Sequence, residues 1–204
     1  MIGIVDYGLG NVKAFANIYH KANMRFVIAR GPADLRDVDR VILPGVGAFD
    51  QAMGRLTASG MRAPLEELVL GKRAPVIGVC VGLQILMRSS EEGTSPGLGW
   101  IDGDVVRFQR PADDAQLRIP HMGWNDVDAR NGSALFAGVG ADAHFYFLHS
   151  YYVRCEREED VLATTNYSRN FACAVQRGNI FGVQFHPEKS HQFGVRLLKN
   201  FGEL

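Results

Sequence analysis

The sequence has no excess of charge of either sign, because 22 lysines and arginines balance 22 aspartates and glutamates. Nucleic acids and anionic membranes usually bind a basic surface, so this balance disfavours both as partners. A chain near zero net charge repels other protein surfaces only weakly. We therefore expect no nucleic acid and no membrane partner, and association with another protein remains open.

Cysteines and long apolar runs are also scarce, so we expect neither a disulfide framework nor a signal peptide nor a membrane span. Its three cysteines, Cys80, Cys155 and Cys173, are few and odd in number, which favours a reducing, cytoplasmic compartment. No basic stretch with a long apolar region opens the chain, as a signal peptide would require. The longest apolar run, residues 76–87, is interrupted by Gln84 and falls short of the ~20 residues of a membrane helix. The composition thus predicts a cytoplasmic globular protein and no function.

Short apolar runs alternate with helical patterns in the first half of the chain. With 47% hydrophobic residues, the 204 residues suffice for a single domain, residues 1–204, with a sizeable core. Strands are predicted at residues 2–5, 26–29, 40–43 and 76–79, and helices at about 11–22, 49–58 and 64–71. Continuous apolar strands that alternate with helices are typical of a parallel sheet covered on both faces.

The second half contains short strand patterns separated by turn residues. They are predicted at residues 105–108, 144–153, 161–165, 172–176 and 180–184, with a hairpin turn at 176–180. We interpret them as antiparallel additions to the sheet edge. Ser190 is expected to cap a last helix, whose Phe193, Leu197, Leu198 and Phe201 share one face. The predicted fold class is α/β, with a mostly parallel central sheet, helices on both faces and antiparallel edge strands.

A strand, a sharp turn and the start of a helix meet at Cys80. Gly78 and Gly82 flank this cysteine at two-residue spacing, which is the cysteine version of a nucleophile elbow. A sulfur at a helix N-terminus is stabilised as a thiolate, and the N–H of Val81 is offered to a developing oxyanion. Cys80 is therefore the candidate nucleophile, and a buried structural cysteine is the alternative. Cys155 and Cys173 have no flanking glycines and are interpreted as structural.

A thiolate nucleophile needs a base that a third group orients. His186 is the strongest candidate among six histidines because it ends a predicted strand. Glu188 lies two residues further on, so it can share the same side of the chain and orient the ring. Pro187 fixes the backbone between them. Cys80, His186 and Glu188 therefore form a predicted catalytic triad.

The patterns do not favour a metal or a bound cofactor. His144 and His149 are an odd number of residues apart, so on one strand they would point to opposite faces. Neither Cys-x-x-Cys nor His-x-x-x-His spacing occurs. The glycines at residues 8–10 and 45–47 lack the third glycine of a dinucleotide-binding loop. We expect no metal and no cofactor.

At this point the motifs resemble a known family. The Gly-x-Cys-x-Gly elbow and the later Phe-His-Pro-Glu segment are similar to the signature of class I glutamine amidotransferases. Further segments resemble the glutaminase subunits of imidazole glycerol phosphate synthases, from histidine biosynthesis. They are DYGLGN at 6–11, PGVGAF at 44–49, PHMGWN at 120–125, YFLHSY at 146–151 and GVQFHPEKS at 182–190. The resemblance covers nearly the whole chain, and its small departures, Val81, Leu83 and Asp50, remove no catalytic group.

The resemblance implies a role for each matching position. Cys80 would attack the side-chain amide of L-glutamine, with His186 as base and then as acid for the departing ammonia. Val81 would supply one oxyanion donor, and the segment Gly45, Val46 and Gly47 the second. The positions that match glutamine-binding residues are Gln84, Glu92, His149, Ser150 and Tyr151.

The resemblance also implies a heterodimer with a (β/α)8-barrel cyclase subunit, which would receive the ammonia through a channel. Positions around the interface and gate are Asn11, Met122, Trp124, Tyr146 and Lys189. Trp124 lies in an expected Gly-Trp-Asn loop. By itself the residue fits a core position better, but an aromatic in such a loop is also a reasonable interface anchor.

Three other functions remain open from the sequence. A stand-alone cysteine hydrolase or γ-glutamyl hydrolase could use a similar elbow, although PfpI-like peptidases commonly carry His where this chain has Val81. A non-catalytic binding subunit would normally have lost Cys80 or His186. Paralogous subunits that supply ammonia for surface-sugar modification share the same motifs.

Overall fold

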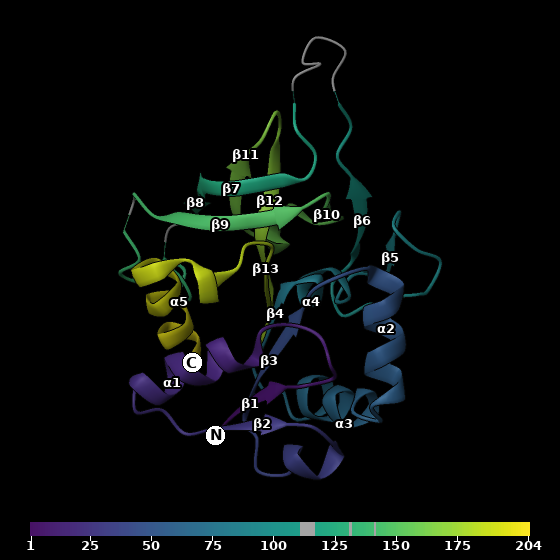
Figure 1. The fold of residues 1–204 in the computed structure, drawn as a ribbon, viewed down its shortest axis with the longest axis vertical. Helices are drawn as coiled ribbons and strands as arrows, with labels where there is room; N and C mark the ends of the chain where they lie inside the picture. The colour runs from purple at the N-terminus through teal and green to yellow at the C-terminus, as the bar shows by residue number, and fades with distance from the viewer. Residues whose placement is uncertain (111–116, 131, 141) are drawn as a thin grey trace.

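The computed structural model describes residues 1–110, 117–130, 132–140 and 142–204. Its main feature is an 11-stranded sheet with the order β2-β1-β3-β4-β13-β12-β10-β6-β5, in which β11 pairs with β12 and β8 (Figure 1). The strands of this sheet are β1 (Ile2–Val5), β2 (Phe26–Ala29), β3 (Arg40–Gly45), β4 (Val76–Cys80), β5 (Ser89–Ser90), β6 (Gly103–Arg107), β8 (Asp128–Ala129), β10 (Tyr151–Cys155), β11 (Val161–Asn166), β12 (Asn170–Arg177) and β13 (Ile180–Val183).

The half of the sheet that carries β4 is parallel, as the sequence predicts. Strands β2, β1, β3, β4 and β13 pair in parallel, and every residue of β1, β4 and β13 is buried. The prediction for residues 180–184 is wrong in its placement, because β13 pairs in parallel with β4 inside the sheet and is not an antiparallel addition at the edge. The strand predicted at 40–43 extends two residues further than expected. Pro44 and Gly45 continue it because they pair with Val79 and Cys80 of β4. The end of β3 therefore lies directly beside the elbow.

Helices cover both faces of the parallel half. Figure 1 shows α1 (Val12–Lys21) and α5 (His191–Glu203) on one side, and α2 (Phe49–Ala58) and α3 (Arg62–Glu66) on the other. α3 begins two residues earlier than predicted and continues as a π-helical turn, Glu67–Gly71. The hydroxyl of Tyr19 in α1 donates to the Leu198 carbonyl oxygen in α5 at 2.9 Å, which joins the two helices. None of the helices in the described residues has the length and apolar character needed to cross a bilayer.

The antiparallel part differs from the prediction in its connections. The strand predicted at 144–153 is wrong, because Ser150 separates β9 (His144–His149) from β10. β9 pairs with β7 (His121–Asp126) in a separate two-stranded antiparallel sheet, so these strands are not additions to the edge of the main sheet. β7 contains Trp124, so the expected Gly-Trp-Asn loop is also wrong. The hairpin turn between β12 and β13 is confirmed.

The last helix begins where the sequence predicts but is capped differently. Leu197, Leu198 and Phe201 are buried on one face of α5, and Phe193 is half-buried. Ser190 stands at the N-cap position, but its hydroxyl makes no cap hydrogen bond. It donates to the His186 carbonyl oxygen at 2.6 Å and accepts from the backbone N–H of Tyr146 at 3.0 Å. Ser190 thus joins β9 to the segment that follows β13.

Glycines allow the elbow to pack against β3. A Cβ atom on Gly82 would lie 1.9 Å from the Leu43 carbonyl oxygen, and one on Gly45 would lie 2.5 Å from the Gly82 nitrogen. A Cβ atom on Gly78 would lie 2.5 Å from the Gly82 carbonyl oxygen. All three obstructing atoms belong to the backbone, so no side-chain rotation can make room. The two glycines that flank Cys80 are therefore required by close backbone approach.

Replacing Gly82 with alanine should destabilise the protein by at least about 1–3 kcal/mol, because the new methyl group overlaps the backbone of β3. Gly54 is the matched control, since it lies in α2 and a methyl group added there would meet no atom within 4 Å. Gly54→Ala should raise the free energy of unfolding by about 0.5–1 kcal/mol. Denaturant titration measures both variants. Equal stability of Gly82→Ala and the unchanged protein would contradict the role assigned to this contact.

Candidate active site

Cys80 ends β4 in a backbone conformation that residues other than glycine rarely adopt. Its φ is 56° and its ψ is −111°, and the next residue, Val81, begins the single-turn helix α4 (Val81–Gln84). Such conformations are unfavourable by about 1–3 kcal/mol and persist only where the surrounding structure holds them. Here the packing of the elbow glycines against β3 holds the turn. The side chain of Cys80 is thereby placed at the carboxyl end of the parallel strands, where α/β sheets commonly bind ligands.

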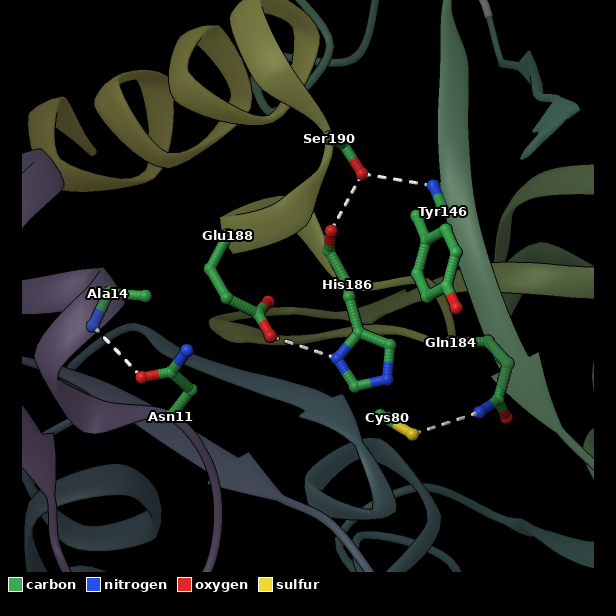
Figure 2. Close-up of polar contacts among 8 residues, drawn as sticks. All are labelled: Asn11, Ala14, Cys80, Tyr146, Gln184, His186, Glu188 and Ser190. Atoms are coloured by element: carbon green, nitrogen blue, oxygen red, sulfur yellow. Dashed lines mark hydrogen bonds and ion pairs between the residues drawn. The ribbon is translucent and has the colours of Figure 1, made fainter. Parts of the chain in front are cut away.

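His186 lies between Cys80 and Glu188, as Figure 2 shows. Its Nδ1 atom is 2.9 Å from Oε1 of Glu188, and its other ring nitrogen is left for the hydrogen bond with Cys80. The side chains of His186 and Glu188 are 4% and 3% exposed. His186 therefore contacts both other members of the predicted triad, in the order that a nucleophile, a base and an orienting carboxylate require.

The surroundings of His186 favour its protonated form. Burial alone would lower its pKa, but the hydrogen bonds to Cys80 and Glu188 and the charges of both groups outweigh burial and raise it to about 10. The pKa of His186 is higher in the folded state than its unfolded value of 6.5, so protonation of this ring stabilises the folded protein. The contribution is complete below pH 6.5 and is lost as the pH rises to about 10. The sulfur of Cys80 and the carboxylate of Glu188 thus both favour the imidazolium form of His186.

A cavity of about 310 Å³ opens beside Cys80. Its wall includes every residue predicted to bind glutamine and three of the four residues predicted to stabilise the oxyanion. Its lining consists of Val46, Gly47, Cys80, Val81, Gln84, Glu92, Pro120, Leu148, His149, Ser150, Tyr151, His186 and Lys189. Gly45 is outside the lining because it packs within β3 against Gly82.

A side-chain hydrogen bond anchors the end of β3, just before the next loop begins. The hydroxyl of Tyr7 donates to the Pro44 carbonyl oxygen at 2.8 Å, and Tyr7 is buried. Val46 follows at the cavity wall and is exposed, and Gly47 has a left-handed φ of 91°. Tyr7 belongs to one of the motifs noted in the sequence, but nothing in its local pattern indicates this contact with residue 44.

Glu92 reaches the cavity from a loop that is tied to α2. Its Oε2 atom accepts a hydrogen bond from the backbone N–H of Phe49 at 2.8 Å. Asp50, in the first turn of α2, accepts in return from the backbone N–H groups of Thr94 and Ser95, both at 3.0 Å. These backbone hydrogen bonds lower the pKa of Asp50. Asp50 is thus a positioning group that the sequence alone did not identify.

Two glutamine side chains connect the cavity wall to the sulfur. Nε2 of Gln84 donates to the Tyr151 carbonyl oxygen and to Oε1 of Gln184, both at 3.2 Å. Nε2 of Gln184 in turn lies 3.8 Å from Sγ of Cys80 (Figure 2). The sequence patterns did not single out Gln184. Its position two residues before His186 on one extended segment was the available signal.

Two buried histidines lie behind the cavity. Nδ1 of His149 is 2.7 Å from the Tyr151 carbonyl oxygen, and its Nε2 is 3.0 Å from Nδ1 of His121. Burial lowers the pKa of His149 to about 3 and that of His121 to about 4, so both rings are neutral at physiological pH. His149 and His144 lie on opposite faces of β9, buried and exposed, as predicted. Both ring nitrogens of His149 are occupied by protein groups.

Contacts connect several of the residues predicted at an interface. Met122 and Trp124 are on the outward face of β7, 65% and 48% exposed, so Trp124 is not a core residue. Tyr146 of β9 lies beside them, with ring centroids 6.1 Å from Trp124, and Nζ of Lys189 lies 5.6 Å from the Tyr146 ring. Asn11 instead caps α1, where its Oδ1 accepts from the backbone N–H of Ala14 (Figure 2).

The remaining cysteines differ from Cys80. Burial raises the pKa of the Cys155 thiol to about 12 and raises that of Cys173 further. Cys155 lies at the end of β10 and Cys173 is buried in β12. Their environments agree with the structural interpretation. Among the described residues, no three His, Cys, Asp or Glu side chains gather as a metal site would require.

Known proteins similar to this chain agree on one family. The family model "Glutamine amidotransferase class-I" matches residues 4–203. The imidazole glycerol phosphate synthase subunit HisH of Bdellovibrio bacteriovorus is 53% identical over 204 residues, and that of Leptospira interrogans is 51% identical. Both matches cover all of this chain and all of the relative.

Solved structures agree on the fold at much lower identity. A crystal structure of a glutamine amidotransferase superposes with a TM-score of 0.74 at 18% identity, covering 100% of this chain and 99% of the other. A chain from the structure of PurLQS from Thermotoga maritima gives 0.67 at 18% identity, covering 98% and 96%. The α/β fold class is thereby confirmed. The chain belongs to the class I glutamine amidotransferase family, in the branch of the HisH subunits of imidazole glycerol phosphate synthase.

Proposed function

We propose that this chain is the glutaminase subunit of an imidazole glycerol phosphate synthase in histidine biosynthesis. It hydrolyses L-glutamine to glutamate and ammonia and passes the ammonia to its synthase partner. The main support is the contact of Cys80, His186 and Glu188 at the wall of a 310 Å³ cavity. We further propose that residues 1–204 form one domain that acts in the cytoplasm, without a metal or cofactor.

The first half of the reaction uses the protonated His186. The thiolate of Cys80 forms a bond to the side-chain amide carbon of glutamine, and the carbonyl electrons move to its oxygen. The backbone N–H of Val81 and a second N–H from residues 45–47 stabilise this oxyanion. His186 then gives its proton to the nitrogen, the C–N bond breaks, and ammonia leaves a γ-glutamyl thioester.

The second half returns the site to its starting state. His186, now neutral, takes a proton from a water molecule as the oxygen of that water attacks the thioester carbon. The C–S bond breaks, glutamate leaves, and Cys80 is again a thiolate beside an imidazolium ion. Glu188 holds the ring orientation and stabilises the imidazolium charge throughout both halves.

Charge and position suggest how glutamine is held. The carboxylate of Glu92 pairs with the α-ammonium group, because it lies on the cavity wall. Oε1 of Gln84 is the acceptor on that side chain that remains after Nε2 donates to Tyr151 and Gln184. Ser150 and Tyr151 offer backbone groups to the substrate. His149 contributes by holding the Tyr151 carbonyl group in place.

An exposed apolar patch beside the cavity supplies the docking surface for the partner. The patch consists of Met122 and Trp124 on β7 and Leu148 on β9, all of which are exposed. Large exposed aromatic and aliphatic side chains of this kind are typical interface anchors. Leu148 also lines the cavity, so a bound partner would cover its opening. We propose that the partner is a (β/α)8-barrel cyclase subunit. Tyr146 and Lys189 border the path by which ammonia enters this subunit, and Asn11 contacts the subunit at the edge of the interface.

Cys80→Ala should abolish glutamate formation from glutamine in the complex with the cyclase subunit, because no nucleophile remains. Cys155→Ala is the matched control and should retain activity. Coupled detection of glutamate measures both. Turnover by the Cys80→Ala complex would overturn the proposal, and strong hydrolysis of γ-glutamyl peptides by the chain alone would favour a γ-glutamyl hydrolase instead.

Glu188→Gln should lower the pKa of His186 from about 10 by roughly 1–3 pH units, because it removes the negative charge that favours the imidazolium ion. The ring titration of His186 in histidine-labelled protein, followed by NMR, measures this change. His20 is exposed on α1 and serves as the internal reference. An unchanged midpoint for His186 would show that Glu188 does not orient or stabilise the ring.

Asp50→Ala should raise KM for glutamine about threefold to tenfold with little change in kcat, because it frees the loop that carries Glu92. Asp37→Ala removes an exposed carboxylate away from the site and is the control. Steady-state kinetics of the complex measure both variants. A loss of kcat at constant KM would contradict a role in substrate binding.

A further inference from the structure

The amide group of Gln184 makes a polar contact with the sulfur of Cys80. Its Nε2 atom lies 3.8 Å from Sγ. An N–H group aimed at the sulfur favours the thiolate, whereas the oxygen of the same amide would oppose it. A rotation of this side chain by half a turn exchanges the two. The orientation of the amide therefore determines whether Gln184 assists the nucleophile.

The orientation is fixed by the neighbouring glutamine. Gln84 places Nε2 against the Tyr151 carbonyl oxygen, which can only accept a hydrogen bond. The second hydrogen on that nitrogen is then directed at Gln184, whose oxygen must receive it. The nitrogen of Gln184 is consequently the atom that faces Sγ. Because the Tyr151 carbonyl oxygen can only accept, it fixes the orientation of both amides and so places a donor next to the sulfur.

The Tyr151 carbonyl group is itself held by the buried histidine pair. Its oxygen also accepts from Nδ1 of His149, so the Nε2 atom of that neutral ring must be an acceptor. His121 therefore donates from Nδ1, and its own Nε2 accepts from Nδ2 of Asn125. The other hydrogen on Nδ2 goes to the Asn166 carbonyl oxygen. Each group from Asn125 to the sulfur has one assignment that satisfies all of these contacts.

Aromatic packing holds the His121 ring in place. The ring stacks between Phe147 and Tyr167, with centroid separations of 4.7 and 4.0 Å and interplanar angles of 22° and 21°. A phenylalanine would fill the same space without the desolvation cost of two ring nitrogens. The polar ring is thus explained by its hydrogen bonds and not by the volume that it fills.

We propose that His121 and His149 are positioning residues for the nucleophile, whose hydrogen bonds orient the amides of Gln84 and Gln184 so that an N–H faces Sγ of Cys80. This deepens the proposed function and depends on it only for the role of Cys80. Without the donor on His121, His149 is free to move its proton to Nε2. Two lone pairs would then face each other at the Tyr151 carbonyl group, and the amides would lose their anchor.

The test compares two substitutions of His121 with opposite effects. His121→Phe keeps an aromatic ring between Phe147 and Tyr167 but removes both hydrogen bonds. His121→Asn keeps a donor near the position of Nδ1 but removes the ring. The hydrogen-bond role predicts that only the phenylalanine variant disturbs Cys80, whereas a merely structural role predicts the reverse.

The measurement is the rate of Cys80 alkylation by iodoacetamide in the full chain as a function of pH, with the modified peptide quantified by mass spectrometry. Gln184→Met removes the donor itself and should slow alkylation at pH 7 about tenfold, with the pH profile displaced upward by about one unit. His121→Phe should displace the profile in the same direction. Tyr152→Phe removes one hydroxyl from the same aromatic cluster, where it bonds Arg169, and should leave the profile unchanged.

Unchanged profiles for Gln184→Met and His121→Phe would overturn the inference, as would equal displacement by His121→Asn and His121→Phe. Thermal unfolding verifies that each variant is folded. If His121→Phe does not fold, Gln84→Met interrupts the same hydrogen bonds at another point and must displace the profile. The alkylation rate is measured without glutamine, so it tests this inference separately from the proposed function. A displaced profile would sustain the inference even if the chain failed to hydrolyse glutamine with its partner, a failure that would reject the proposed function.

Discussion

The site depends on the close approach of two backbone segments, the elbow at Gly82 and the end of β3 at Leu43. No side chain fits between them, and this contact holds Cys80 at a φ of 56°. The register that pairs Gly45 with Cys80 also starts the next loop beside the sulfur. One packing constraint therefore positions both the candidate nucleophile and the loop with Val46 that borders the cavity.

The histidines around the cavity differ in their tendency to carry a positive charge, and their neighbours explain the difference. His186 is buried against a carboxylate and a sulfur, which raise its pKa. In the part of the chain that the structure describes, His121 and His149 have no carboxylate or sulfur partner, so burial lowers the pKa of both, and the charge of His186 lowers that of His149 further. The positive charge is thereby confined to the ring next to Cys80. Neutral rings behind the cavity keep fixed donors and acceptors, which a mobile proton would disturb.

Local patterns in the sequence predicted the parts of the site that local structure determines. The glycines around Cys80 and the His-Pro-Glu segment carry their own geometry, and the strands at 2–5 and 26–29 have the predicted bounds. Contacts between distant segments left no such signal. The break at Ser150, the pairing of β7 with β9 and the hydrogen bonds of Gln184 depend on which strands meet, and local propensity does not encode this. Ser190 shows the same limit, because its hydroxyl accepts a hydrogen bond from the backbone N–H of Tyr146 and does not cap the helix.

The order of the strands has a consequence for biosynthesis. β4, which carries Cys80, lies between β3 and β13, and β13 begins only at Ile180. A nascent chain that has not reached this strand exposes one edge of β4, and open edges of this kind are prone to aggregation. The same chain lacks His186, so its thiol has no partner base. Completion of the sheet beside β4 and the pairing of Cys80 with its base therefore both depend on the same short segment, from Ile180 to His186.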